Sequence, residues 1–223
     1  MAIGTEILML KMINAMFPDV PKSFKIILAS GSPRRQLFFK EMGLEVEIRI
    51  KAIEENYPET LKAGEIPDYL ARLKAKAFEN TLSPDEILIT SDTVVWHRNK
   101  ALGKPIDEMD AISILMSLSD DWHEVITSVC FTTLETQRTV NHTTRVKFRA
   151  LTDREILYYV KEFHPYDKAG GYGIQEWIGL TGIEESQGSY SNVVGLPTHL
   201  VYATLQDLMG PALMHNIEKN TLS

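Results

Sequence analysis

Residues 26–39 read IILASGSPRRQLFF, an apolar run that stops at small residues before a second apolar segment begins. The three aliphatic residues at 26–28 predict a buried strand, and residues 29–31 predict a tight turn. Ser32 is a favourable helix N-cap, and Pro33 suits the first helical position, where no backbone N–H is needed. The stretch therefore predicts a strand, a turn and a helix in succession, with the helix ending near Gly43.

Arg34 and Arg35 fall in the first turn of this predicted helix. The helix dipole disfavours cations there, so two arginines are costly unless an anion lies among them. Free N–H groups, the Ser32 hydroxyl and two guanidinium groups converging on one point would form a phosphate site. A capped helix with two solvated arginines is the alternative, and the spacing alone does not separate the two interpretations.

Composition restricts the class of protein. The 223 residues fit one large α/β domain or two small lobes, and 44% hydrophobic with 24% charged residues is typical of a globular chain. The net charge of −7 argues against a protein that binds nucleic acid by neutralising its phosphates, but it leaves room for a small phosphorylated substrate in a basic cleft. The single Cys130 lies in an apolar run, which indicates a buried thiol and a reducing, cytoplasmic setting. No apolar stretch is long enough to cross a membrane, and no membrane partner is expected.

The remaining pattern alternates strands and helices. Residues 1–24 are expected to form an N-terminal extension with helical spacing and no chemistry. Strands are predicted at residues 44–50, 87–91, 122–134 and 137–148, the last two paired as a hairpin, and helices from Pro67, from Asp107, over 153–163 and over 198–208.

Three charged positions stand out along this pattern. Asp92 closes the apolar run at 87–91, and an acid at a strand end is a candidate metal ligand or general base. Lys104 lies between Gly103 and Pro105, and Lys168 precedes a glycine-rich stretch that lacks the order of a Walker A loop. His123 and His142 have no metal-ligand spacing, which favours a structural role for both.

Seven motifs in order carry a resemblance to a known family: LASGSPRR, LARLKA, SDTVV, LGKP, WHEVIT, DKAGGYGIQ and GSYSNVVGLP. The series resembles that of the Maf family of nucleoside triphosphate pyrophosphatases, from about residue 25 to 208. It implies a domain over 25–210 and a C-terminal tail at 211–223. It also implies an α/β fold with a long mixed sheet, flanking helices and two lobes around a cleft, similar to inosine-triphosphate pyrophosphatases.

The resemblance implies hydrolysis of a nucleoside triphosphate to the monophosphate and pyrophosphate, with Mg²⁺ or Mn²⁺ as cofactor. Asp92 matches the proton acceptor, with Glu55 as the second metal ligand beside it. The other catalytic positions matched are Lys74, Lys104 and Arg35, and the substrate-binding positions matched are Ser32, Arg34, Thr93, Lys168 and Gln175.

Subfamily detail points to a pyrimidine substrate. Arg34, Thr93 and Gln175 match the branch that acts on dTTP and UTP, and modified pyrimidine nucleotides are further expected substrates. A glutamine amide offers a donor and an acceptor together, which suits a pyrimidine edge carrying a carbonyl and an N–H. Two departures from the family pattern are Ser128, where glycine is usual, and an Asp120–Asp121 pair before Trp122.

Three other functions stay open at this point: a non-catalytic nucleotide-binding regulator of cell division, a nucleic-acid-binding protein and a sugar-phosphate phosphatase. The acidic balance opposes the second. The family is often dimeric, so a homodimer is a further expectation.

Overall fold

The computed structural model describes residues 24–210, 212–214 and 216–217. Within them, seven strands form one mixed sheet in the order β2-β1-β3-β5-β6-β7, with β4 paired to β3. The strands are β1 (Lys25–Leu28), β2 (Val46–Ile48), β3 (Glu86–His97), β4 (Lys100–Leu102), β5 (Trp122–Thr132), β6 (Gln137–Phe148) and β7 (Ile183–Gln187). The predicted α/β fold with a long mixed sheet is confirmed, while the helical spacing expected within residues 1–24 lies outside the described residues.

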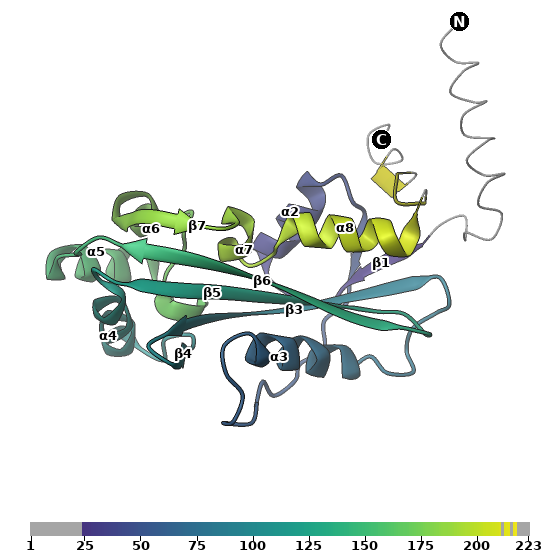
Figure 1. Cartoon of the computed structure of the whole chain (residues 1–223), viewed down its shortest axis with the longest axis horizontal. Coiled ribbons are helices and arrows are strands. Elements are labelled where there is room, and N and C mark those ends of the chain that lie inside the picture. The colour runs from purple at the N-terminus through teal and green to yellow at the C-terminus, as the bar shows by residue number, and fades with distance from the viewer. Residues whose placement is uncertain (1–23, 211, 215, 218–223) are drawn as a thin grey trace, which may run out of the picture.

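Helices cover the sheet in two groups, one at each end (Figure 1). At one end, α2 (Pro33–Glu41) and α8 (Thr198–Met209) lie on one face and α3 (Glu65–Lys76) lies on the other. At the other end lie α4 (Glu108–Leu118), α5 (Asp153–Phe163) and α6 (Trp177–Gly182). The short helix η1 (Ala169–Gly171) lies between α5 and α6 along the chain, and α7 (Tyr190–Val194) lies between β7 and α8.

The helices at the two ends of the sheet pack into different hydrophobic clusters, and α3 packs into clusters of its own on the opposite face. Phe39 of α2, Leu205 of α8 and Phe131 of β5 belong to one buried cluster, and Leu115 of α4 and Tyr159 of α5 belong to a second. Burial of large apolar side chains is the dominant favourable contribution to such cores. The sheet is therefore shared by two separately packed lobes.

The three longest strands run through both lobes. β5 pairs antiparallel with β6 from Trp122 to Thr132, as the predicted hairpin requires, and β3 pairs antiparallel with β5 from Leu88 to Trp96. Strands of 11 or 12 residues are long for a globular protein. They make the molecule elongated and tie the lobes together (Figure 1).

One edge of β3 has an interval without a partner strand. Parallel pairing with β1 ends at Ile89, and antiparallel pairing with β4 begins at Val95. Among the described residues no strand pairs with the interval between them on that edge. The interval contains Asp92, which was predicted from the sequence to lie at the end of a strand. That prediction is wrong for β3, which continues to His97. The strand can continue because β5 pairs with it along the other edge. The parallel pairing of β3 with β1 does end close to Asp92, three residues before it, at Ile89.

Other boundaries shift for local reasons. β2 is three residues long because it is an edge strand bonded only to β1. α3 begins at Glu65, since a proline is tolerated anywhere in the first turn of a helix. α6, α7 and β7 had no prediction, because each is short and lies in the glycine-rich and acidic segments after residue 170.

Both departures from the family pattern have a structural explanation. The Ser128 hydroxyl is buried and donates to the Asp68 carboxylate of α3 at 2.5 Å, which joins that helix to β5. Asp120 adopts φ +56°, the left-handed conformation in which glycine is favoured and aspartate is tolerated. Asp121 accepts hydrogen bonds from Arg98 and pairs with His97, so both substitutions take up local roles.

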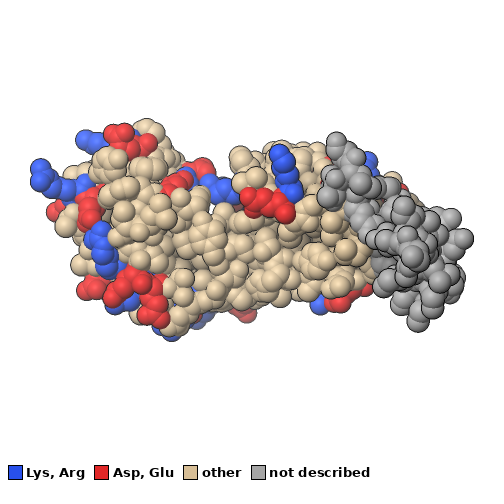
Figure 2. Space-filling model, turned by 90° about the horizontal axis from the view of Figure 1, so that it is seen from above, with Lys and Arg blue, Asp and Glu red and all other residues tan. Residues whose placement is uncertain are grey.

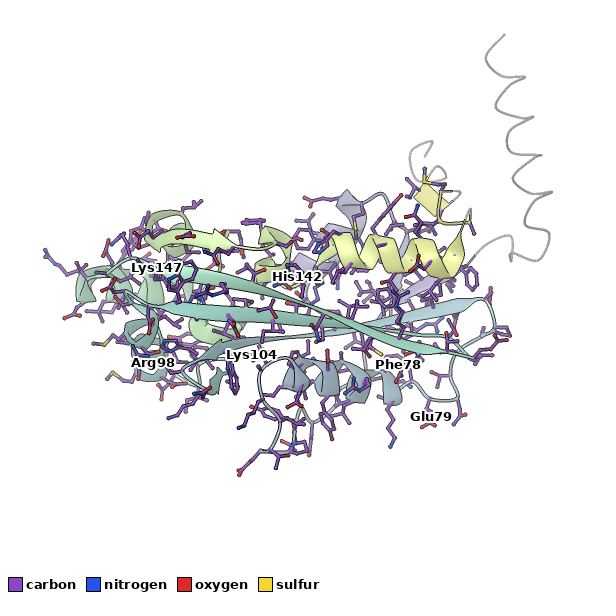
Figure 3. The ribbon with its side chains drawn as sticks, in the orientation of Figure 1. Phe78, Glu79, Arg98, Lys104, His142 and Lys147 are labelled. Atoms are coloured by element: carbon purple, nitrogen blue, oxygen red, sulfur yellow. The ribbon has the colours of Figure 1, made fainter. Side chains whose placement is uncertain are left out.

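The surface has mixed charge. On the face seen in Figure 2, blue and red side chains gather toward the end formed by α4 to α6, and the middle is largely uncharged. Lys104 lies beneath the long strands, between α3 and β4 (Figure 3). None of the helices in the described residues could cross a membrane.

Gly170 tests how tightly the loop before α6 packs on β3. It has φ +71°, and a Cβ placed on it would lie 2.7 Å from Val95 Cγ2. We expect Gly170→Ala to lower the free energy of unfolding by about 1 to 3 kcal/mol, measured by urea denaturation, because it adds backbone strain and a steric clash. Gly103→Ala is the matched control, since a Cβ there meets nothing within 4 Å. Equal losses in the two variants would contradict this account.

Candidate active site

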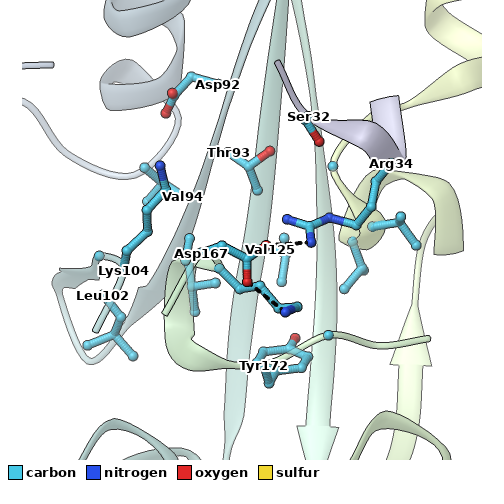
Figure 4. Close-up of a pocket in the computed structure, with 18 of the residues that line it drawn as sticks. Ser32, Arg34, Asp92, Thr93, Val94, Leu102, Lys104, Val125, Asp167 and Tyr172 are labelled. Atoms are coloured by element: carbon cyan, nitrogen blue, oxygen red, sulfur yellow. Dashed lines mark hydrogen bonds and ion pairs between the residues drawn. The ribbon is translucent and has the colours of Figure 1, made fainter. Parts of the chain in front are cut away.

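A cleft of about 330 Å³ opens beside the unpaired interval of β3 (Figure 4). In the close-up, Asp92 and Lys104 lie on one side of it and Ser32 and Arg34 on the other. Both lobes contribute to its lining. All ten residues predicted for the site line this one cleft: Ser32, Arg34, Arg35, Glu55, Lys74, Asp92, Thr93, Lys104, Lys168 and Gln175.

Lys74 joins the two predicted metal ligands. Its Nζ lies 2.5 Å from Asp92 Oδ1 and 3.0 Å from Glu55 Oε1. It also donates to the Ser91 carbonyl at 3.4 Å, an oxygen on the unpaired edge of β3. The lysine is brought here by the last turn of α3, which packs across the sheet. Two carboxylates are therefore held around a single ammonium group.

The two carboxyl groups differ in burial. Burial raises the pKa of Asp92 above the ordinary aspartate value, and the attraction of Lys74 only partly offsets this. Burial also opposes the charge on Glu55, but Lys74 and Lys104 outweigh it and lower the pKa of that carboxyl. Glu55 is half-exposed, with 46% of its side chain accessible. Burial therefore favours the protonated form of Asp92 more than in an ordinary aspartate, and the neighbouring cations favour the charged form of Glu55.

Arg35 is used mainly to hold the cleft together. Its Nε donates to the Gly195 carbonyl at 2.8 Å, Nη1 to the Ser91 carbonyl at 3.2 Å and Nη2 to Thr93 Oγ1 at 3.0 Å. Burial lowers the pKa of its guanidinium group. Three of its five N–H groups are thus committed within the protein, and the rest are available to a ligand. The predicted cap is also present, with Ser32 accepting from Arg35 N at 3.5 Å.

Thr93 has a defined hydrogen-bond direction. Thr127 donates its hydroxyl hydrogen to the Asn192 carbonyl at 3.0 Å, so it must accept from Thr93 Oγ1, 2.9 Å away. Thr93 therefore has no hydrogen left to donate and presents only an acceptor to the cleft. His123, expected to be structural, is buried four residues before Thr127 on β5 and is paired with the Tyr172 hydroxyl at 2.7 Å.

Asp167 bridges two predicted substrate-binding cations that lie far apart in the sequence. Its Oδ2 lies 2.9 Å from Arg34 Nη1, and its Oδ1 lies 2.7 Å from Lys168 Nζ (Figure 4). Burial opposes the charge on Asp167, but the two cations lower the pKa of its carboxyl. Each oxygen takes one cation, as two oxygens of a phosphate would.

Lys104 and Gln175 face the cleft from exposed positions. Neither side chain forms a hydrogen bond or an ion pair within the part of the chain that the structure describes, so both are available to a ligand. Asp167 and Glu176 were missed as site residues by the sequence. Their positions directly beside Lys168 and Gln175 were the available signal.

The carboxylate pair suits a divalent cation. Mg²⁺ usually takes one or two protein carboxylates together with substrate phosphate oxygens. Asp92 and Glu55 supply two carboxylates around Lys74 in the cleft, whereas no group of three acidic, His or Cys ligands occurs among the described residues. The donor set therefore fits a metal that shares its coordination with the substrate.

Comparisons with known proteins agree on one family. A family model described as Maf-like protein matches residues 25–208. A dTTP/UTP pyrophosphatase of Flavobacterium johnsoniae is 55% identical over 87% of this chain and 100% of its own length. A dTTP/UTP pyrophosphatase of Christiangramia forsetii is 54% identical over 87% of this chain and 99% of its own length.

Two solved structures were also matched, with low scores. The Staphylococcus aureus Ham1 protein has a TM-score of 0.39 at 12% identity, covering 56% of this chain and 71% of that one. A nucleoside-triphosphatase (dITP/XTP pyrophosphatase) of Mycobacterium abscessus has a TM-score of 0.36 at 16% identity, covering 57% and 76%.

Arg35→Lys tests whether the guanidinium group holds the cleft together. An ammonium group cannot reach three separate acceptors, so we expect the free energy of unfolding to fall by about 2 kcal/mol in urea denaturation. Arg98→Lys is the control, because Arg98 is 71% exposed in its pair with Asp121 and the same change there should cost less than about 0.5 kcal/mol. A similar cost at both positions would show that Arg35 does not have this role.

Proposed function

The chain belongs to the Maf family, and on that premise we propose that it hydrolyses dTTP and UTP to the monophosphate and pyrophosphate. Relatives named for that activity match this chain over nearly their whole length. The observation that carries the proposal is the buried carboxylate of Asp92, set among cations that come from α2, α3 and two loops around one cleft. Nucleotide-pool housekeeping, including removal of modified pyrimidine analogues, is the role such an activity would serve.

Asp92 is the proposed general base. A water molecule attacks the α-phosphorus while its proton passes to the Asp92 carboxylate. The bond from the α-phosphorus to the bridging oxygen breaks, and pyrophosphate leaves with the electron pair. A base with a raised pKa takes that proton more readily than an ordinary carboxylate, and the hydrogen bond from Lys74 keeps Asp92 oriented.

The cations stabilise charge that builds up on the phosphoryl oxygens and on the leaving group. Catalysis of this kind depends chiefly on positioning and electrostatics. Lys74 and Lys104 lie near the proposed base and belong with the reacting phosphate, while Arg34 lies across the cleft and shares the Asp167 carboxylate with Lys168. Arg35 contributes its uncommitted N–H groups, and Ser32 offers its hydroxyl at the start of α2.

A divalent cation, Mg²⁺ or Mn²⁺, would be held by Asp92 and Glu55 together with the substrate. When bound, the cation would neutralise part of the negative charge of the phosphate groups. With it in place Lys74 would lose part of its pairing to the two carboxylates, which frees the ammonium group for a phosphoryl oxygen.

Base selection is assigned to Gln175 and Thr93. The exposed Gln175 amide can donate to a pyrimidine carbonyl and accept from its ring N–H. Thr93, which has only an acceptor to offer, favours a group that donates. Arg34, which also lines the cleft, adds a cation to this set.

The main test is a substrate panel with product identification. Purified protein with Mg²⁺ or Mn²⁺ should release pyrophosphate from dTTP and UTP faster than from 7-methyl-GTP. Asp92→Asn should lower kcat by about a hundredfold or more, because it removes the base and keeps the shape. Asp85→Asn, an exposed aspartate outside the cleft, is the control.

Three outcomes would sink the proposal. Release of orthophosphate alone would indicate a phosphatase. Binding of nucleotide without turnover would support the regulator that the sequence left open. Unchanged activity in Asp92→Asn would remove this residue as the base.

Gln175→Glu tests base selection separately. The carboxylate cannot donate to the pyrimidine carbonyl, so we expect kcat/KM for dTTP and UTP to fall by about tenfold or more. Gln206→Glu on α8 introduces the same charge at an exposed position and should leave kcat/KM as in the wild type. If the two variants behave alike, the amide does not read the base.

A further inference from the structure

We propose that Tyr159 and Glu176 are positioning residues that hold the Lys168 ammonium group in place for the phosphate chain. The proposal rests on the function proposed above, because it assigns a purpose to a contact chain behind one of its cations. The chain begins at a fully buried tyrosine of α5 and ends at a lysine in the cleft. Neither Tyr159 nor Glu176 lines the cleft itself.

Lys168 is an unusually buried cation. Only 9% of its side chain is accessible, so its charge requires partners within the protein. It has two of them: Asp167 Oδ1 at 2.7 Å and Glu176 Oε1 at 3.0 Å. The two carboxylates differ in exposure, with 60% of the Asp167 side chain accessible but only 20% of Glu176. Glu176 is therefore the inner partner and Asp167 the outer one.

Glu176 is itself fixed by Tyr159. The hydroxyl of Tyr159 accepts the Gly173 N–H at 3.0 Å, so its single hydrogen is free to go to Glu176 Oε2. Burial and the neighbouring carboxylate of Glu176 raise the pKa of Tyr159, which keeps the hydroxyl protonated and able to donate. The ring is held in turn by stacking on Phe163, with centroids 5.0 Å apart. One hydroxyl thus orients both the loop backbone and the inner carboxylate.

The two partners of Lys168 then have different tasks. Asp167 also pairs with Arg34, so its two oxygens occupy the two cations that a phosphate would bridge. Phosphate oxygens can replace an exposed carboxylate, while Glu176 stays bonded to Tyr159 and continues to hold Lys168. The ammonium group therefore stays in position as it changes its outer anion.

The test compares phosphate affinity in matched variants. Inorganic tripolyphosphate is the probe, titrated into the full-length protein by calorimetry at fixed salt. Tyr159→Phe deletes one oxygen and keeps the ring, and we expect the Kd to rise about tenfold. Tyr158→Phe makes the same change one residue earlier, at a half-exposed position, and should leave the Kd unaltered. Glu176→Asp keeps the charge but shortens the reach, so it should weaken binding by a similar factor.

A double-mutant cycle separates positioning from general destabilisation. If Tyr159 acts through Lys168, then Tyr159→Phe should change the Kd less than about twofold in a Lys168→Met background. Additive losses, or an unaltered Kd in both Tyr159→Phe and Glu176→Asp, would overturn the proposal. Because this readout needs no turnover, it is independent of the pyrophosphate assay. Failure of the wild type to hydrolyse any nucleotide would reject the proposed function alone.

Discussion

The site depends on one gap in backbone pairing. Along one edge of β3 the hydrogen bonds of β1 end at Ile89 and those of β4 begin at Val95. The buried Ser91 carbonyl in this gap would otherwise be an unsatisfied acceptor, and it receives hydrogen bonds from Arg35 and Lys74 instead. The interruption in the sheet thus leaves a carbonyl oxygen to which two cationic side chains, Arg35 and Lys74, donate hydrogen bonds. It also leaves Asp92 facing a space that side chains, rather than a strand, must fill.

Charge balance within the cleft follows from this arrangement. Lys74 is paired with Glu55 and Asp92, and Lys168 is paired with Asp167 and Glu176. Each buried cation therefore carries its own counter-ions, which offsets the cost of removing it from water. A polyphosphate that enters the cleft replaces carboxylates as the partners of these cations. The cations are already gathered in the cleft before it binds.

The predictable part of the structure consists of features set by local residue patterns. The Ser32–Pro33 start of α2, the hairpin of β5 and β6 and the limits of α5 all follow from capping residues and periodicity. The grouping of ten residues in one cleft came from the ordered motifs, since no local pattern brings Lys74 to Asp92. The features that could not be predicted depend on pairing between strands that are far apart in the sequence. The strand β3 runs past a buried acid only because β5 supports it.

Tyr159 illustrates the same limit at the level of one side chain. In the sequence it is an aromatic residue on the apolar stripe of a helix, and its ring does pack in the core. Nothing local distinguishes its hydroxyl, whose partners Gly173 and Glu176 lie 14 and 17 residues further along the chain. Such contacts form only when the loop after α5 folds back onto that helix, so the sequence alone does not reveal them.

The continuity of the long strands has a mechanical consequence. β5 and β6 pass from one lobe to the other without a loop between them (Figure 1). Domain closure around a ligand usually uses a few hinge residues that absorb large changes in φ and ψ. Here a change in the width of the cleft would have to bend or twist a hydrogen-bonded ladder along its whole length. The hydrogen-bonded strands that join the two lobes therefore oppose any change in the width of the cleft between them.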